Sequence, residues 1–148
     1  MLSQGATVPS VEESSETPFY IPATGASTRA RRTLKHGDCF AVLDAHADIG
    51  ASMGGPDGIF FSDTRYLSHL EILLNGHQPL LLGSSVRDDN STLTVDLTNP
   101  DIYLDDKLVL PKDILHVVRT VFLWRDTAYK RLRIHNHGER PCEVRLTL

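Results

Sequence analysis

The chain has 148 residues, of which 41% are hydrophobic and 23% are charged. This composition is typical of a single soluble globular domain, and it excludes collagen-like, coiled-coil and fully disordered proteins. The 15 Lys and Arg residues are outnumbered by 19 Asp and Glu residues, and the net charge of -4 argues against a nucleic-acid-binding protein. Cys39 and Cys142 lie far apart in the sequence. They predict reduced thiols rather than a zinc site or a disulfide framework.

Residues 1–32 differ in composition from the rest of the chain. They are rich in Ser, Thr, Glu, Pro and Gly and show no hydrophobic period, so we expect a disordered tail followed by one domain over residues 33–148. The start of the chain has no apolar core of signal-peptide length, and the longest apolar runs are too short to cross a bilayer. We therefore expect a cytoplasmic protein without a membrane partner.

From Leu34 onward the dominant hydrophobic period is two, which predicts strands and no helix. The pair Asn75-Gly76 favours a tight hairpin turn between a strand over 65–75 and a return strand over 79–83. A strand over 128–135 is expected to pair with 141–148, and the apolar run 114–124 is expected to be a central strand covered on both faces. The predicted fold is an all-β, supersandwich-like antiparallel β-sandwich. Its remaining strands are expected at 39–49, 92–98 and 108–110.

The last segment, 142–148, still alternates between apolar and polar residues where the sequence stops. We expect a β-sandwich that is incomplete at its C-terminal end. Missing strands would leave a sheet edge and apolar faces open to solvent.

Asp44, His46 and Asp48 form the sharpest local cluster of potential ligands. In an extended strand they share one face at spacings of about 7 Å. Such a set can bind a transition metal or act as a general base. We favour the solvent face of an edge strand instead, because one strand alone rarely completes a ligand shell.

No motif for nucleophilic catalysis or nucleotide binding is present, and none of the many aspartates stands out as half of a catalytic pair. The sequence therefore assigns no catalytic residue and no cofactor. Asp63, Arg65 and Tyr66 lie together at the start of a predicted strand, and Trp124 lies at the end of another. These four residues are the candidates for contacts with a partner domain or for a substrate loop.

Several stretches occur together in a familiar order: LKHGDCFAV at 34–42, ADI at 47–49, GIF at 58–60, DTRYLS at 63–68, LLNG at 73–76, DN at 89–90 and LTVDLTNPD at 93–101. In this set the chain resembles the N-terminal domain of bacterial glycogen debranching enzymes, the amylo-alpha-1,6-glucosidase family. The likeness covers nearly everything from Leu34 to Leu148. It departs from the usual pattern at Cys39, where a small hydroxyl residue is commoner.

The resemblance implies a β-sandwich that precedes a large (α/α)6 barrel, in which the acid and base for hydrolysing an α-glucosidic bond are located. No helical pattern of that kind occurs here, so we expect a non-catalytic accessory domain whose partner is such a helical barrel. One alternative is a free-standing carbohydrate-binding module for α-glucans, with Trp124 and the tyrosines as stacking surfaces. Another is a small metal-dependent enzyme built on Asp44, His46 and Asp48.

Overall fold

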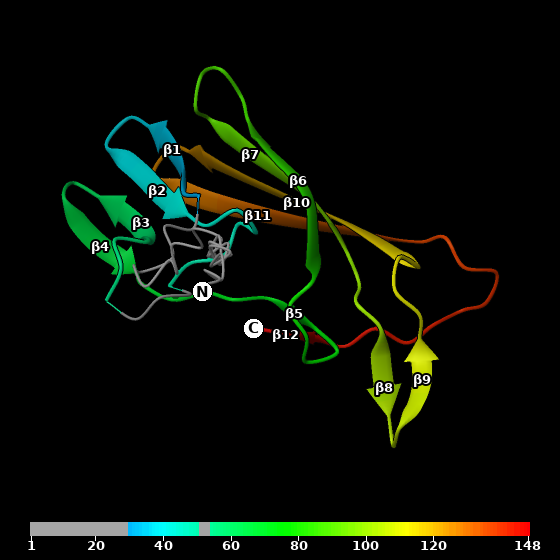
Figure 1. Cartoon of the computed structure of the whole chain (residues 1–148). Coiled ribbons are helices and arrows are strands. Elements are labelled where there is room, and N and C mark those ends of the chain that lie inside the picture. The colour runs from blue at the N-terminus through cyan, green and yellow to red at the C-terminus, as the bar shows by residue number, and fades with distance from the viewer. Residues whose placement is uncertain (1–29, 51–53) are drawn as a thin grey trace, which may run out of the picture.

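The computed structural model describes residues 30–50 and 54–148, and these residues form only strands, turns and loops. The described part holds no helix that could span a membrane. Two four-stranded antiparallel sheets and two short two-stranded ribbons make up the fold (Figure 1). The prediction of an all-β antiparallel fold is confirmed.

The first sheet has the strand order β1-β2-β3-β4. Its strands are β1 (Arg32–His36), β2 (Cys39–Leu43), β3 (Gly58–Phe61) and β4 (Thr64–Leu67). Ser62 and Asp63 both have positive φ, 45° and 63°, as a two-residue turn between antiparallel strands requires. The expected strand over 65–75 is wrong: β4 ends at Leu67, and only a single bridge, from Leu70 to Ile49, separates it from the next short strand.

The second sheet has the strand order β11-β10-β7-β6. Its strands are β6 (Leu80–Val86), β7 (Thr92–Thr98), β10 (Leu115–Trp124) and β11 (Thr127–Asn136). The strand predicted over 92–98 is confirmed at both ends. The pairing predicted between 128–135 and 141–148 is wrong, because β11 pairs along its whole length with β10. Arg125 and Asp126 make this possible, since both have positive φ (44° and 61°) and close a two-residue turn.

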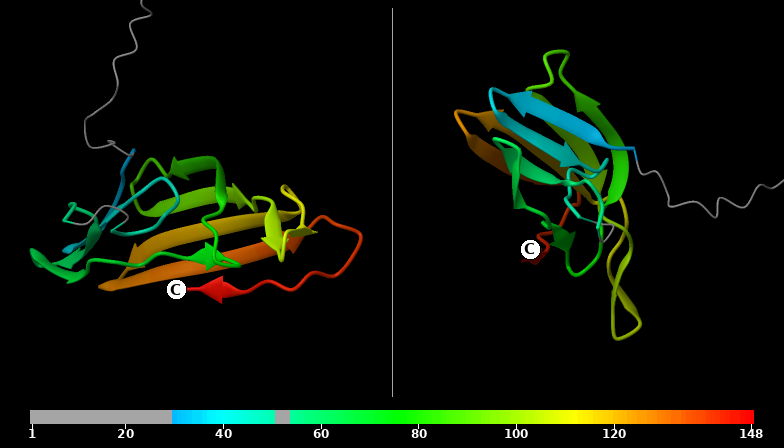
Figure 2. Two further views of the ribbon diagram at one scale, coloured as in Figure 1. Left: turned by 60° about the horizontal axis from the view of Figure 1, so that its bottom comes forward. Right: turned by 90° about the vertical axis from the view of Figure 1, so that its left-hand side faces the viewer.

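The two ribbons lie beside the second sheet (Figure 2). One is the projecting hairpin of β8 (Ile102–Leu104) and β9 (Lys107–Leu110), and the other joins β5 (Leu73–Leu74) to β12 (Leu146–Thr147). The tight turn predicted at Asn75-Gly76 is confirmed, with φ of 47° and 78°. The chain leaving this turn pairs with β5 only at the bridge between Leu74 and His77. β6 then pairs with β7, and β5 takes β12 as its partner.

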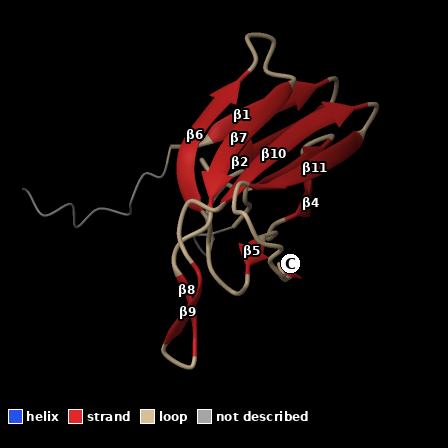
Figure 3. Cartoon of the chain, turned by 90° about the vertical axis from the view of Figure 1, so that its right-hand side faces the viewer, coloured by secondary structure: helices blue, strands red, loops and turns tan. Residues whose placement is uncertain are grey.

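The hydrophobic core lies between the two four-stranded sheets. Alternate residues of the facing strands are buried, and side chains of this size contribute about 1.5–3 kcal/mol each when removed from water. The main contributors are Leu34, Ala41, Leu43, Leu93, Val95, Leu97, Val117, Val121 and Leu123. This packing of two sheets face to face is the predicted sandwich, and in Figure 3 the strands β1 and β2 overlap β7 and β10. Cys39 and Cys142 are free thiols, and burial raises the pKa of Cys39.

The strand predicted over 39–49 stops early, at Leu43. Asp44 ends it, because its Oδ1 atom accepts hydrogen bonds from the backbone N–H groups of His46 and Asp48, each at 2.8 Å. Ala47 follows with a positive φ of 63°. The expectation that Asp44, His46 and Asp48 share a solvent-facing strand is therefore wrong: Asp44 and Asp48 are 2% and 1% exposed.

β10 is buried on the face toward the core and half-buried on the other, so the expectation of cover on both faces is only partly met. In the middle of its buried face lies Arg119, which is fully buried. Its Nη1 atom donates to both carboxylate oxygens of Asp48, at 2.9 and 3.0 Å, and to the carbonyl of His46 at 2.8 Å. Its Nη2 atom donates to the carbonyl of Ile72. One guanidinium thus binds two loops to the central strand.

Lys130 of β11 completes this group, which we call the Arg119 cluster (Arg119, Asp48 and Lys130). The Nζ atom of Lys130 donates to the carbonyl of Ala47 at 2.7 Å and lies 3.3 Å from Asp48 Oδ1. Burial lowers the pKa of Lys130, an effect that Asp48 opposes and Arg119 reinforces. Arg119, whose Nη1 atom lies within 3.0 Å of both carboxylate oxygens, is therefore the principal counter-charge of Asp48.

Replacing Arg119 by methionine should destabilise the fold by about 3–5 kcal/mol, because Asp48 then stays buried without its main partner. Chemical unfolding in urea measures the loss. The matched control is Arg131→Met, which removes an exposed arginine from β11 and should change the free energy of unfolding by less than about 0.5 kcal/mol. Equal effects of the two changes would contradict this account of the core.

Candidate functional site: a groove beside the β8–β9 hairpin

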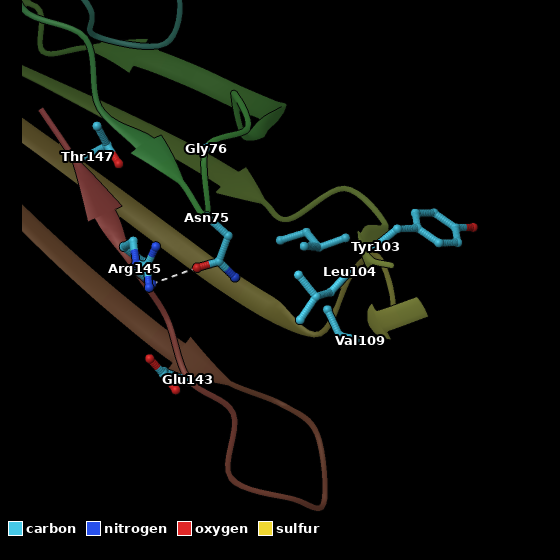
Figure 4. Close-up of a pocket in the computed structure, with 9 residues that line it drawn as sticks. Asn75, Gly76, Tyr103, Leu104, Val109, Glu143, Arg145 and Thr147 are labelled. Carbon is cyan, nitrogen blue, oxygen red and sulfur yellow. Dashed lines mark hydrogen bonds between the residues drawn. The ribbon is translucent and has the colours of Figure 1, made fainter. Parts of the chain in front are cut away.

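A hollow of about 450 Å³ lies where three segments that are distant in the sequence meet. The turn after β5, the β8–β9 hairpin and the segment leading into β12 form its walls (Figure 4). We call it the groove. Its lining residues are Asn75, Gly76, Ile102, Tyr103, Leu104, Val109, Glu143, Arg145 and Thr147.

Asn75 holds two walls of the groove together. Its backbone N–H donates to the carbonyl of Arg145 at 2.8 Å, and its side-chain Oδ1 accepts from the N–H of Arg145 at 2.6 Å. Figure 4 shows the second bond as a dashed line. Asparagine suits this position, because it tolerates the positive φ of the turn and supplies an acceptor at the same time. The turn residue that ends β5 thus fixes the segment around β12.

The third wall is the β8–β9 hairpin, residues 102–110, which we call the arm. It projects from the body of the sandwich (Figures 1 and 3). Asp105 and Asp106 close its tip with φ of 49° and 60°. Its sides are apolar and open to solvent, and in Figure 4 the ring of Tyr103 points away from the rest of the groove. The exposed large apolar side chains of the arm are Tyr103, Leu104, Leu108 and Val109.

The base of the arm is anchored by a second, smaller core. Ile102, Leu110 and Leu115 are buried together, with Cys142 and Val144 packed against them. Asn99 closes the end of β7 beside it, donating to the carbonyl of Pro111 at 2.7 Å and accepting from the N–H of Leu115 at 2.7 Å. The arm is therefore fixed at its base and exposed along its length. Several exposed apolar side chains on one short hairpin are typical of an interaction site.

The polar groups of the groove include a single carboxylate. Glu143 is the one carboxylate among the lining residues, with the guanidinium of Arg145 and the amide of Asn75 as further polar groups. Hydrolysis of a glycosidic bond by the usual route needs two carboxyl groups on either side of that bond. The lining of the groove does not supply such a pair.

Asp63, Arg65 and Tyr66 lie at the other end of the sandwich, at and after the β3–β4 turn (Figure 1). Arg65 donates from Nη1 to the carbonyls of Gly55 and Asp57, at 3.0 and 3.3 Å, so it ties down the preceding loop. Tyr66 is 71% exposed. Asp63 borders a shallow hollow together with Asp38 of the neighbouring turn, and both carboxylates are exposed to solvent.

Trp124 lies at the end of β10, and half of its surface is exposed. Its ring packs at 4.9 Å from the ring of His36 and lies under the guanidinium of Arg125. Trp124 does not line the groove, and its ring contacts are with His36 and Arg125 rather than with Asp63, Arg65 or Tyr66, so the four candidates do not form one site.

Within the described residues, no group of three or more His, Cys, Asp or Glu side chains is arranged to hold a metal ion. Of the three candidates from the sequence, Asp48 is bound by Arg119 and Lys130, and Asp44 shapes its own turn. The arrangement gives Asp44 and Asp48 a structural role in the core.

Sequence reasoning did not find the groove. The sequence predicts Asn75 only as a turn residue, and it predicts Glu143 and Arg145 as part of a regular strand. The signal that was available is the sequence YLDDKLV at 103–109, in which apolar residues flank two aspartates that favour a turn. Nothing in the sequence, however, brings residues 75, 103 and 145 together.

The fold is that of an all-β, sandwich-like domain with an exposed apolar arm, and the groove beside the arm has a single carboxylate in its lining. The family model described as the N-terminal domain of (some) glycogen debranching enzymes matches residues 34–148. The chain belongs to this family, and the resemblance noted from its motifs is confirmed. Neither a curated protein nor a solved structure gives a significant match.

Replacing Asn75 by alanine should open the β5–β12 ribbon, because it removes the acceptor for Arg145 and leaves a Cβ at positive φ. We expect a loss of about 1–3 kcal/mol and faster hydrogen exchange at the amide of Arg145. Asn90→Ala is the matched control, since Asn90 also has positive φ (55°) but lies in the β6–β7 turn. Arg145 exchange that responds equally to both changes would contradict this role of Asn75.

Proposed function

We propose that this chain is a non-catalytic accessory domain that braces the helical catalytic domain of a glycogen-debranching α-glucosidase. The observation that carries the proposal is the arm, a fixed hairpin with four exposed apolar side chains beside a groove, in a chain that belongs to the N-terminal domain family of these enzymes. In this proposal the partner domain supplies the acid and the base of hydrolysis. The arm and the groove supply a contact surface for it.

The chemistry of the arm supports a protein partner rather than a soluble sugar. Leu104 and Val109 are aliphatic and more than half exposed, at 64% and 52%. Aliphatic surface gains by contact with another apolar surface, whereas sugar recognition depends on aromatic stacking and polar groups. The groove beside the arm adds Asn75, Glu143 and Arg145 as a polar rim, as interfaces between proteins commonly have.

The test uses the chain and a separately produced helical catalytic domain of a debranching enzyme of the same family. Titration calorimetry should detect binding, and the double change Leu104→Ser with Val109→Ser should weaken it at least about tenfold. Leu82→Ser is the matched control, because Leu82 is equally exposed (61%) but lies on β6. The chain alone should release no glucose from a branched glucan.

Two results would contradict the accessory role. One is glucose release by the purified chain that disappears when a single carboxylate is replaced. The other is binding of the catalytic domain that the double change on the arm leaves intact while Leu82→Ser weakens it.

One observation favours the alternative of a carbohydrate-binding module for α-glucans. The β10–β11 hairpin carries three aromatic residues. Phe122 and Tyr129 stack at 4.8 Å between ring centres, and Trp124, whose ring packs on His36, lies two residues farther along β10. Such a group on a sheet face can form a platform for sugar rings. This site is separate from the groove, so the two functions are distinguishable.

If the platform binds glucan, the chain should be retarded on a glucan affinity gel and Trp124→Ala should abolish the retardation. Tyr66→Ala is the control, because Tyr66 is the more exposed aromatic residue (71%) but lies on β4. Unretarded migration of the unmodified chain would contradict the binding-module function and leave the accessory function in place.

A further inference from the structure

One edge of the second sheet is formed by β11, which is longer than β6 at the opposite edge. β11 has ten residues, all paired with β10 on one side, and no strand of the described chain pairs with its other side. Open edges present unpaired backbone N–H and C=O groups and invite another strand unless they are blocked. β11 is therefore a potential acceptor for an added strand.

The other sheet edges of the described chain are shorter or obstructed. β6 carries an irregularity in its pairing between Leu81 and Gly83, which twists a strand and interrupts its edge. The edge of β1 donates from the N–H of Lys35 to the carbonyl of Asn90 at 2.9 Å. β4 has only four residues. β11 lacks each of these protections.

The register of the β10–β11 hairpin identifies the backbone groups that face outward. Trp124 and Thr127 flank a two-residue turn and so form a hydrogen-bonded pair. Because such pairs alternate along an antiparallel ladder, every second residue of β11 after Thr127 also bonds to β10. The residues between them direct their N–H and C=O groups to the open edge. They are Ala128, Lys130, Leu132 and Ile134.

The charge of β11 selects the kind of strand that fits. Arg131 and Arg133 are exposed on one face, next to His135, and β11 contains no Asp or Glu, although the whole chain has a net charge of -4. On the opposite face Leu132 and Ile134 are only partly buried against the core. A complementary strand would carry acidic residues on one face and apolar residues on the other. A second copy of β11 would instead place like charges opposite each other, which is destabilising.

We propose that β11 is a docking edge for an extended acidic segment, which adds to the second sheet as a fifth strand. Main-chain hydrogen bonds to the outward-facing residues supply the affinity. Alternate carboxylates opposite Arg131 and Arg133 supply the selectivity, and alternate apolar side chains extend the core beyond Leu132 and Ile134. This edge shares no residue with the groove or with the arm, so the proposal stands apart from the accessory function.

The probe is a synthetic ten-residue peptide of alternating Glu and Val, labelled with a fluorophore, and its binding to the full chain is followed by anisotropy. The double change Arg131→Glu with Arg133→Glu should weaken binding at least tenfold. Lys107→Glu with Lys112→Glu, which reverses one charge on the arm and one just after it, both away from β11, should leave the affinity within about twofold. Hydrogen exchange should slow at Ala128, Lys130, Leu132 and Ile134 when the peptide is bound.

A second peptide of the same sequence, N-methylated at alternate residues along its bonding edge, separates strand addition from charge attraction. It keeps every carboxylate and should bind at least tenfold more weakly. Equal binding of the two peptides would overturn the proposal, as would failure of the first peptide to bind. Concentration-dependent dimerisation that protects the same four amides would also overturn it, because β11 would then pair with its own copy.

Discussion

The contact of Arg119 Nη1 with both carboxylate oxygens of Asp48 is the interaction on which the rest of the structure depends. Arg119 lies on the central strand β10, and its guanidinium binds the turn that ends β2 and the chain just before β5. Asp48 also accepts from the N–H of Ile72 at 3.3 Å, so the two loops are bound to each other as well as to the sheet. A charge buried this deeply is tolerated because its counter-charge and the hydrogen bonds of both Nη atoms of Arg119 are in place, although its Nε atom has no partner among the described residues.

The position of the groove follows from this contact. Ile72, which Arg119 and Asp48 hold, directly precedes Leu73 and Leu74 of β5, and β5 leads into the turn at Asn75. Asn75 in turn fixes the segment around Arg145. A buried ion pair in the sandwich therefore determines where the far wall of the groove lies. The arm is set independently, by the small core of Ile102, Leu110 and Leu115.

The local features of the fold were predictable from the sequence, and the long-range ones were not. The alternation of Leu93, Val95 and Leu97 predicted β7 with its correct ends, and Asn75-Gly76 predicted its turn. The turn at Arg125 and Asp126 lacks a residue pair that strongly favours positive φ. The sequence therefore predicts 141–148 as the partner of β11, whereas the true partner is β10. A single such error changes the pairing of every later strand.

The candidate site also depends on contacts between residues that are far apart in the sequence. Asp44, His46 and Asp48 alternate in sequence as surface ligands would, but Asp44 turns the chain and Asp48 enters the core to meet an arginine 71 positions away. No local pattern contains that contact. The groove likewise depends on residues 75, 103 and 145, which only the closed fold brings together. The family, by contrast, was recognisable from short motifs, most of which lie on β1, β2, β4 and β7 and in the turns between strands.

Our central proposal is that this domain contacts the helical catalytic domain through its arm and groove. Hydrogen exchange of the full chain, with and without the helical catalytic domain of a debranching enzyme, tests that claim most directly. We expect slower hydrogen exchange in residues 102–110 and 143–147 when the catalytic domain is added, and unchanged exchange in β4. Protection confined to the β3–β4 region, or none anywhere at saturating partner, would contradict it.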